Sequence, residues 1–335
     1  MSQALYTPGL GYYANDRPKF GALPASGSDF ATAPGMSPLF GRALAAQVAE
    51  ALDATGADTV WEFGAGTGEL AAQLLAGLGE RAARYRIIEL SASLRARQRE
   101  RLADFGDRVE WLDALPAAMS GVVVGNEVLD AMPVKLLVRL QGRWHERGVT
   151  LHDGRLTHAD QATDLRPPVD IPGSHDYLTE IHPQAEAFIG TLADRLQVGA
   201  AFFFDYGFPE HEYFHPQRDM GTVMCHRAHQ ADADALADVG LKDITAHVNF
   251  TGVALAGQDA GLRVAGYTSQ GRFLLNSGLL DGMDNAPLQD RVMVQKLVNE
   301  HEMGELFKVL AFATAGVDEA WVPGGFSAGD RMHTL

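Results

Sequence analysis

The chain has 335 residues, of which 46% are hydrophobic, and its 43 acidic and 27 basic side chains give a formal net charge of −16. Such a chain repels phosphate backbones, so we predict no nucleic-acid partner; the charge serves solubility and favours basic partners. The single cysteine, Cys225, excludes an internal disulfide and fits a reducing compartment. No apolar run approaches the roughly 20 residues that span a bilayer, so no membrane segment is predicted.

Short apolar segments alternate with helix-like segments from residue 39 onwards, which predicts a parallel sheet with helical crossovers. The apolar segments are 59–63, 85–90, 108–113 and 121–128, and the helix-like segments are 39–52, 69–82 and 91–105. Ser91 can cap the last of these helices. The stretch 200–208, which is apolar apart from Asp205, is typical of a central strand. We therefore predict an α/β fold built on a Rossmann-like, doubly wound sheet.

The pattern changes after Pro133, where hairpin-like strands follow one another with Gly142 and the Asp-Gly pair at 153–154 as turn signals. This predicts a β-rich insertion. Near the end, the stretch 289–312 has helix-like spacing and predicts a helical C-terminal extension. The predicted organisation is an irregular N-terminal arm (1–36), a Rossmann-like core (37–133 and 181–255), the β-rich insertion (134–180) and an extension packed on the core (256–335).

The stretch "VWEFGAGTGELAAQLL" (60–75) leads from a strand through a glycine-rich turn into a helix. The turn consists of Gly64, Ala65, Gly66, Thr67 and Gly68. Glycines let a backbone turn tightly and approach a ligand closely, as both dinucleotides and S-adenosylmethionine require. Residues 66–71 fit the dinucleotide pattern G-x-G-x-x-G/A. However, the strand ends near Phe63, so the first glycine of the turn is Gly64. Read from Gly64, the third glycine position of the pattern falls on Glu69, whose carboxylate would repel a pyrophosphate. The register therefore favours S-adenosylmethionine.

Three acidic residues lie at or near the ends of successive predicted strands. Glu62 can face a cationic amino group, Glu89 can bind ribose hydroxyls, and Asp113 can accept a hydrogen bond from an adenine amine. Taken singly, each acid could equally be a solvated strand end. Together they match the groups of S-adenosylmethionine, which we predict as the cofactor. Because Glu89 also has the spacing of the dinucleotide pattern, an NAD-dependent oxidoreductase remains an alternative.

The segment "VVVGNEVLDAMPV" (122–134) places Asn126, Glu127 and Asp130 at and after the end of a buried strand. Ligands of doubly wound sheets bind at such ends. Carboxylates beside a sulfonium favour a cationic methyl acceptor, and a guanidinium forms forked hydrogen bonds to carboxylates. We predict these three residues as catalytic. The alternative is that Asn126 caps the turn and Glu127 bonds to backbone groups.

Histidine pairs at 211/215 and 226/229 have spacings that could hold a metal ion. No cysteine pair accompanies them, so solvated loop histidines are the simpler interpretation, and we predict no metal site.

Several long segments occur in an order that resembles a known family. They are "GLGYY", "DFATAPGMSPLFGRALA", "EFGAGTGELA", "VVVGNEVLDAMPV", "FDYGF" with "YFHPQRDMGTVMCH", and "DITAHVNFT". Together they are similar to the MidA-type family of S-adenosylmethionine-dependent methyltransferases, which includes a mitochondrial protein arginine methyltransferase that assists respiratory complex I assembly. The resemblance covers nearly the whole chain.

The resemblance implies a Rossmann-type methyltransferase domain with an additional subdomain. It places the cofactor on the turn Gly64–Gly68 and on Glu89, and the family's Asn-Glu-x-x-Asp stretch on Asn126, Glu127 and Asp130. The family's N-terminal motif falls on Asp29, Phe30, Thr32 and Pro34, and implies that the arm closes over the cofactor. Gly35 stands where the family usually has Glu, so no role is carried over for that residue.

The activity implied by the resemblance is protein arginine N-methylation, on a subunit of a respiratory complex or on another protein. A non-catalytic assembly factor that binds S-adenosylmethionine is a further alternative. The implied partner is a basic or arginine-bearing protein, and a homodimer is left open. The implied location is the cytoplasm in a bacterium or the mitochondrial matrix in a eukaryote.

Overall fold

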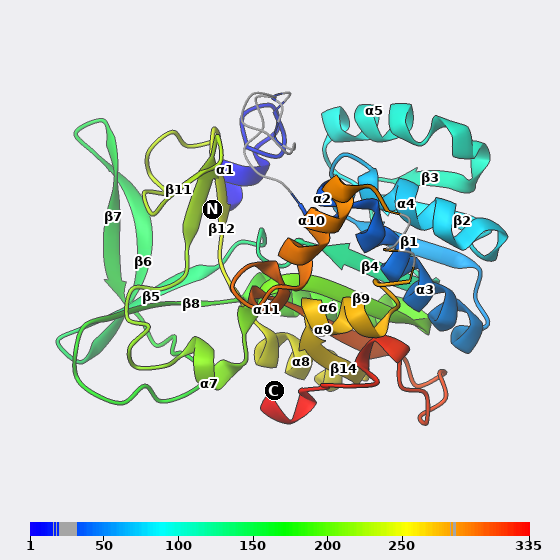
Figure 1. Cartoon of the computed structure of the whole chain (residues 1–335). Coiled ribbons are helices and arrows are strands. Elements are labelled where there is room, and N and C mark those ends of the chain that lie inside the picture. The colour runs from blue at the N-terminus through cyan, green and yellow to red at the C-terminus, as the bar shows by residue number, and fades with distance from the viewer. Residues whose placement is uncertain (16, 18, 20–31, 282, 284–285) are drawn as a thin grey trace.

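The computed structural model describes all residues of the chain except 16, 18, 20–31, 282 and 284–285. Within the described residues, the main sheet has eight strands in the order β14-β15-β9-β4-β1-β2-β3, with β13 paired to β9 (Figure 1). Its strands are β1 (Thr59–Phe63), β2 (Arg84–Ile88), β3 (Val109–Leu112), β4 (Met119–Asn126), β9 (Leu196–Phe208), β13 (Val248–Asn249), β14 (Arg263–Ser269) and β15 (Phe307–Ala313). The neighbours from β3 to β9 are parallel, whereas β15 is antiparallel to both β9 and β14.

Helices cover both faces of this sheet, because successive residues of a buried strand point to opposite sides. On β9, Phe202 and Phe204 pack with the core that includes α3 and α4, whereas Phe203 packs with the core that includes α6 and α8. The longer helices are α3 (Pro38–Thr55), α4 (Glu69–Leu78), α5 (Ala92–Arg101), α6 (Pro183–Arg195), α8 (Phe250–Asp259), α9 (Gln270–Asn276) and α10 (Leu288–Val298). The fold class predicted from the sequence is therefore confirmed.

Local sequence signals begin several of these helices. The side chain of Ser91 accepts a hydrogen bond from the Leu94 N–H and caps α5, as predicted. In the same way, Ser37 caps α3 by accepting from the Leu39 N–H, and Gly56 ends that helix in a left-handed conformation. Shorter helical segments are α1 (Ser2–Tyr6), α2 (Ala33–Met36), α7 (Glu210–Tyr213), α11 (Met303–Leu306), η2 (Gly79–Arg81), η3 (Ala103–Arg108), η5 (Gly324–Phe326) and η6 (Met332–Thr334).

Two smaller sheets lie beside the main one (Figure 1). The four-stranded sheet has the order β7-β6-β5-β8 and falls in the predicted β-rich stretch, with positive φ at Asp153 and Gly154 in its second turn. The three-stranded sheet has the order β11-β10-β12. Their strands are β5 (Lys135–Leu140), β6 (Arg143–His152), β7 (Arg155–Ala162), β8 (Tyr177–Ile181), β10 (Met224–Arg227), β11 (Gln230–Asp232) and β12 (Asp243–Thr245).

The structure differs from the sequence predictions at both ends of the chain. Residues 2–6 form helix α1 rather than an irregular arm, because Leu5 packs with Tyr12 and with Ile244 of the three-stranded sheet. The helix-like stretch 289–312 is a helix only in part, since Phe307–Ala313 forms strand β15. That segment is apolar apart from Lys308 and is buried between β9 and β14, so tertiary packing overrides its helical spacing. The division into domains stays a prediction.

Among the described residues, no helix combines the length and the apolar character needed to cross a bilayer.

The pairing of β4 with β9 requires a glycine where the two backbones approach most closely. A Cβ atom on Gly199 would lie 2.1 Å from the carbonyl oxygen of Gly121 on the neighbouring strand. We therefore expect Gly199→Ala to lower the free energy of unfolding by about 2–3 kcal/mol or more. Gly190→Ala in helix α6 is the control, since a Cβ there meets nothing within 4 Å. Urea denaturation of both variants checks the difference, and equal stabilities would contradict it.

Candidate functional site

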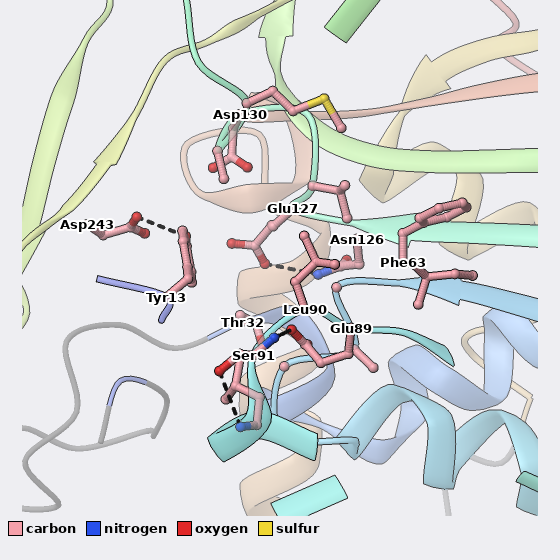
Figure 2. A pocket seen from close by; sticks show the side chains of 18 of the residues that line it. Tyr13, Thr32, Phe63, Glu89, Leu90, Ser91, Asn126, Glu127, Asp130 and Asp243 are labelled. Carbon is pink, nitrogen blue, oxygen red and sulfur yellow. Dashed lines mark hydrogen bonds between the residues drawn. The ribbon is translucent and has the colours of Figure 1, made fainter. Parts of the chain in front are cut away.

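A cavity of about 1050 Å³ opens at the carboxyl ends of β1, β2 and β4 (Figure 2). One part of it is lined by the glycine turn after β1 and by the residues that follow β2. The other part is lined by the loop after β4, by β9 and β12, and by the N-terminal segment. These segments lie far apart in the sequence, and the sheet topology brings them to one edge. This is where doubly wound proteins bind their ligands.

The glycine turn has the backbone geometry that its sequence predicts. Gly64, Gly66 and Gly68 all have positive φ values, of 61°, 52° and 79°. Side chains rarely adopt this conformation, so glycine is required. Strand β1 ends at Phe63, which confirms Gly64 as the first turn residue, and Glu69 lies in the first turn of α4. Of the five predicted turn residues, 64–67 line the cavity, whereas residue 68 caps α4 and lies outside the lining.

Glu62 lies on β1, lines the cavity and is 2% exposed. Its carboxylate accepts a hydrogen bond of 2.7 Å from the Tyr85 hydroxyl. Burial raises the pKa of Glu62 to about 8, and the hydrogen bond only partly opposes this shift. Without a bound cation, the carboxyl group is therefore largely protonated at neutral pH. A cationic group placed beside it would favour the charged form.

Glu89 follows β2 and is also buried, at 7% exposure. One of its oxygens accepts from the Ser91 N–H at 2.9 Å, and the other accepts from the Gln98 side-chain amide at 3.1 Å. The same amide donates to the Gly66 carbonyl at 2.9 Å. Gln98 thus ties the strand-end carboxylate to the glycine turn. Burial raises the pKa of Glu89, while these hydrogen bonds oppose the shift.

Asp113 lines the cavity from the end of β3, but its environment differs from that of the other two acids. Its side chain is 89% exposed and forms an ion pair with Arg95. The Arg95 guanidinium also donates to the carbonyl oxygens of Glu89 and Leu112. Arg95 therefore holds the segments after β2 and β3 together, and it orients the Asp113 carboxylate at the cavity rim.

Glu127 reaches into the cavity through an unusual backbone conformation. Its φ is +55°, a left-handed value that is uncommon for glutamate, and its N–H donates to the Phe204 carbonyl of β9 at 2.8 Å. Asn126 donates to the Glu127 carboxylate at 3.1 Å. Burial, reinforced by the charge of Asp130, raises the pKa of Glu127 to about 8. Burial also raises the pKa of Asp130 to about 6.

Asp205 of β9 fixes the loop that carries these residues. One of its carboxylate oxygens accepts hydrogen bonds from the N–H groups of Val128, Leu129 and Asp130, at 3.2, 2.9 and 3.2 Å. Its other oxygen accepts from the Tyr206 N–H at 3.0 Å. The side chain is 1% exposed. It therefore acts as a buried anchor that keeps 127–130 in one conformation, rather than as a group offered to a ligand.

The opposite wall contains three residues that the sequence predictions did not place in the site, namely Tyr13, Tyr206 and Asp243. The Tyr206 hydroxyl donates to Asp130 at 2.5 Å, the Tyr13 hydroxyl donates to Asp243 at 2.8 Å, and all four side chains line the cavity. Figure 2 shows Asp243 and Tyr13 at the side of the cavity facing Glu127. A signal for all three was present, because "GLGYY", "FDYGF" and "DITAHVNFT" contain Tyr13, Tyr206 and Asp243 and belong to the family resemblance.

The charge of the cavity lining has one sign. In the part of the chain that the structure describes, the lining contains no lysine or arginine. Its acidic residues are Glu62, Glu69, Glu89, Asp113, Glu127, Asp130 and Asp243. In addition, two buried oxygens at the inner end, Oδ1 of Asn126 and Oδ1 of Asp130, accept no hydrogen bond. Buried polar atoms are nearly always paired, so these oxygens indicate a ligand that donates hydrogen bonds.

The N-terminal motif is only partly described. Thr32 and Pro34 line the cavity, at the start of α2, whereas Asp29 and Phe30 lie outside the described residues. The amide of Gln73 in α4 donates to the Pro34 carbonyl at 2.8 Å, which holds α2 against the first helix after the glycine turn.

A doubly wound sheet with a glycine turn and strand-end carboxylates defines a protein that binds a nucleoside-containing cofactor. Residues 43–268 match a family described as "Putative S-adenosyl-L-methionine-dependent methyltransferase". The chain belongs to this family of S-adenosyl-L-methionine-dependent methyltransferases.

Solved structures and curated proteins agree with this family. A "likely methyl transferase" from Burkholderia thailandensis, crystallised with S-adenosyl-homocysteine, is 49% identical, has a TM-score of 0.94, and is matched over 100% of this chain and 90% of its own. The Caenorhabditis elegans "Protein arginine methyltransferase NDUFAF7 homolog, mitochondrial" is 25% identical over 98% of this chain and 86% of its length. The Danio rerio "Protein arginine methyltransferase NDUFAF7, mitochondrial" is 25% identical over 92% of this chain and 81% of its own length. The predicted cofactor, S-adenosylmethionine, is confirmed, and the NAD alternative is set aside.

The raised pKa of Glu62 predicts how the stability of the free protein depends on pH. The group has a pKa of 4.5 when unperturbed and about 8 in the fold. The folded chain therefore binds this proton more tightly than the unfolded chain, and stability falls as pH rises between these values, by up to ~1.4 kcal/mol per pH unit. Glu62→Gln keeps an oxygen for Tyr85 but cannot ionise. We expect the free energy of unfolding of the variant to fall less steeply with pH than that of wild type. At pH 8 the variant should therefore be the more stable protein.

Denaturant titrations between pH 5 and 9 measure this slope. Glu80→Gln, an exposed position near the end of α4, is the control. If Glu62→Gln kept the full wild-type slope, Glu62 would already be ionised in the free protein at neutral pH.

Proposed function

We propose that the protein transfers a methyl group from S-adenosylmethionine to an arginine side chain of a protein. The observation that carries this proposal is the group of acceptors after β4. Glu127 and Asp130 lie there beside Asn126, Oδ1 of Asn126 and Oδ1 of Asp130 accept no hydrogen bond, and no lysine or arginine of the described residues lines the cavity. An acceptor that fits must be cationic and must donate several hydrogen bonds. A guanidinium satisfies both conditions, because it is always charged and carries five N–H donors in a planar fork.

The lining suits the cofactor in charge and in shape. We assign the glycine turn, which includes Ala65 and Thr67, to close backbone contact with the cofactor. Glu62 would bind its cationic amino group, Glu89 its ribose hydroxyls and Asp113 its adenine. Thr32 and Pro34 form the covering side. When bound, S-adenosylmethionine supplies an electrophilic methyl group on a sulfonium. The raised pKa values of Glu62 and Glu89 fit this assignment. The cationic amino group would favour the charged form of Glu62, and hydroxyl groups that donate to Glu89 would favour the charged form of Glu89.

The acceptor end would act chiefly by positioning. The loop after β4 packs against the glycine turn, since a Cβ on Gly64 would lie 3.3 Å from Val128. Glu127, one residue earlier, would therefore hold a terminal nitrogen of the guanidinium close to the cofactor. Its carboxylate, with Asp130 and Asn126, would fix the direction of that nitrogen. Glu127 or Asp130 would accept the proton that the nitrogen loses when it takes up the methyl group. Holding two reactants in line can supply several kcal/mol of a barrier.

The relatives support the same acceptor. The Caenorhabditis elegans and Danio rerio proteins are named protein arginine methyltransferases, and both match over nearly the whole of this chain. The net charge of −16 favours a basic protein partner. The identity of the acceptor protein, the oligomeric state and the location in the cell stay predictions.

A labelled-methyl assay tests the proposal. The purified protein, S-adenosylmethionine with a labelled methyl group, and lysate proteins are incubated, and labelled residues are identified by mass spectrometry. We expect label on arginine nitrogens and, for Glu127→Gln, a fall in rate of at least 100-fold with S-adenosylhomocysteine affinity changed by less than threefold. Such a split is expected when a residue contacts the acceptor and leaves the cofactor alone.

The exposed Glu80→Gln variant serves as the matched control and should behave as wild type. Label on another residue type would replace arginine as the acceptor. Cofactor binding without any transfer would favour the alternative of a non-catalytic assembly factor.

A further inference from the structure

The wall of the cavity opposite Glu127 is built by two segments that lie outside the Rossmann-like sheet. Asp243 is the first residue of β12 in the three-stranded sheet, and it lines the cavity while being only 3% exposed. Tyr13 reaches it from the N-terminal segment, with a hydroxyl that donates to Oδ1 of Asp243 at 2.8 Å (Figure 2). A buried carboxylate is thus presented to the cavity from a direction different from that of Glu127.

The carboxylates of Glu127 and Asp243 face the same part of the cavity. The charge of Asp243 contributes to the raised pKa of Glu127 and to that of Tyr6. Both carboxylates line one cavity, and no lysine or arginine of the described residues lies between them there. Like charges that face each other across a buried space repel, so such a pair is stabilised when a cation occupies that space.

Aromatic rings complete this wall. Tyr6 and Tyr13 stack with ring centroids 5.7 Å apart and an interplanar angle of 22°, and both line the cavity. Their hydroxyls are engaged, because Tyr6 donates to the Ala131 carbonyl at 2.9 Å and Tyr13 donates to Asp243. The hydrogen bond from Tyr6 also joins the N-terminal segment to the loop that carries Asp130. Aromatic rings beside carboxylates favour a planar, weakly hydrated cation over a compact ammonium.

We propose that Asp243, positioned by Tyr13, is a second anchor for the acceptor and makes the site select a guanidinium over an ammonium. The inference rests on the proposed function and deepens it. A guanidinium has terminal nitrogens on two sides, so it can donate to Glu127 with one and to Asp243 with the other. The three donors of a lysine ammonium diverge from a single nitrogen, so an ammonium spans a shorter distance between two carboxylates than a guanidinium does. The preference for a guanidinium over an ammonium would then depend on the distance between Glu127 and Asp243, as well as on the presence of two carboxylates.

Binding of small probes tests this proposal without knowledge of the protein substrate. N-Acetylarginine amide and N-acetyllysine amide are titrated into the full chain saturated with S-adenosylhomocysteine. We expect wild type to bind the arginine probe at least tenfold more tightly than the lysine probe. Asp243→Asn should weaken the arginine probe about tenfold and the lysine probe by less than threefold. Tyr13→Phe, which removes only the positioning hydroxyl, should have a smaller effect in the same direction.

The matched control is Asp238→Asn, an exposed residue between β11 and β12 that pairs with Arg227. It should leave both probes unchanged. Thermal unfolding and S-adenosylhomocysteine affinity show whether Asp243→Asn remains folded; if it does not, Tyr13→Phe decides the question.

The outcomes separate this inference from the proposed function. If Glu127→Gln abolishes arginine binding while folded Asp243→Asn retains wild-type affinity and selectivity, Asp243 is not an anchor and the proposed function stands. The same conclusion follows if Asp243→Asn unfolds and Tyr13→Phe matches wild type. If wild type binds both probes equally, or methylates no arginine, both proposals fail.

Discussion

The structure depends on the burial of carboxylates that have no cation of their own. Glu62, Glu127 and Asp130 lie in one cavity, each with a raised pKa that is due mainly to burial. Protein interiors penalise isolated charges, so Glu62 and Glu127, each with a pKa of about 8, are largely protonated at neutral pH until an opposite charge arrives. The cofactor of this family carries both an ammonium and a sulfonium, and the acceptor that we propose is a cation as well. One electrostatic constraint would therefore account for binding of the cofactor and of the proposed acceptor.

The fold maintains this costly arrangement with neighbours that are themselves rigid. Asp205 accepts three backbone N–H groups from the loop after β4, and this loop carries Glu127 in a left-handed conformation. The strand that bears Asp205 lies between β4 and β15, inside the main sheet. Backbone strain at a functional residue persists when its surroundings fix it. The central strand β9 thus has two roles: it forms part of the core, and through Asp205 it fixes the loop that carries Glu127 and Asp130.

The sequence predicted the features whose causes are local. The glycine turn, the acids at strand ends and the cap at Ser91 each follow from a few adjacent residues, and their placement was confirmed. Two kinds of feature could not be predicted in this way. Strand β15 has helical spacing, and its position between two strands overrides that pattern. The pair Tyr13–Asp243 joins residues 230 positions apart, through a packing of α1 on the three-stranded sheet that no periodicity reveals.

The most direct test of the electrostatic account is proton release on cofactor binding. Calorimetric titration of the free protein with S-adenosylmethionine at pH 7, in buffers of different ionisation enthalpy, measures the protons exchanged per ligand bound. Carboxyl groups with a pKa near 8 are protonated at this pH, and a cation lowers their pKa values, so the account predicts net release of protons and a smaller release for Glu62→Gln. Binding enthalpies that are the same in every buffer would show that the carboxylates are already ionised, and would contradict the account.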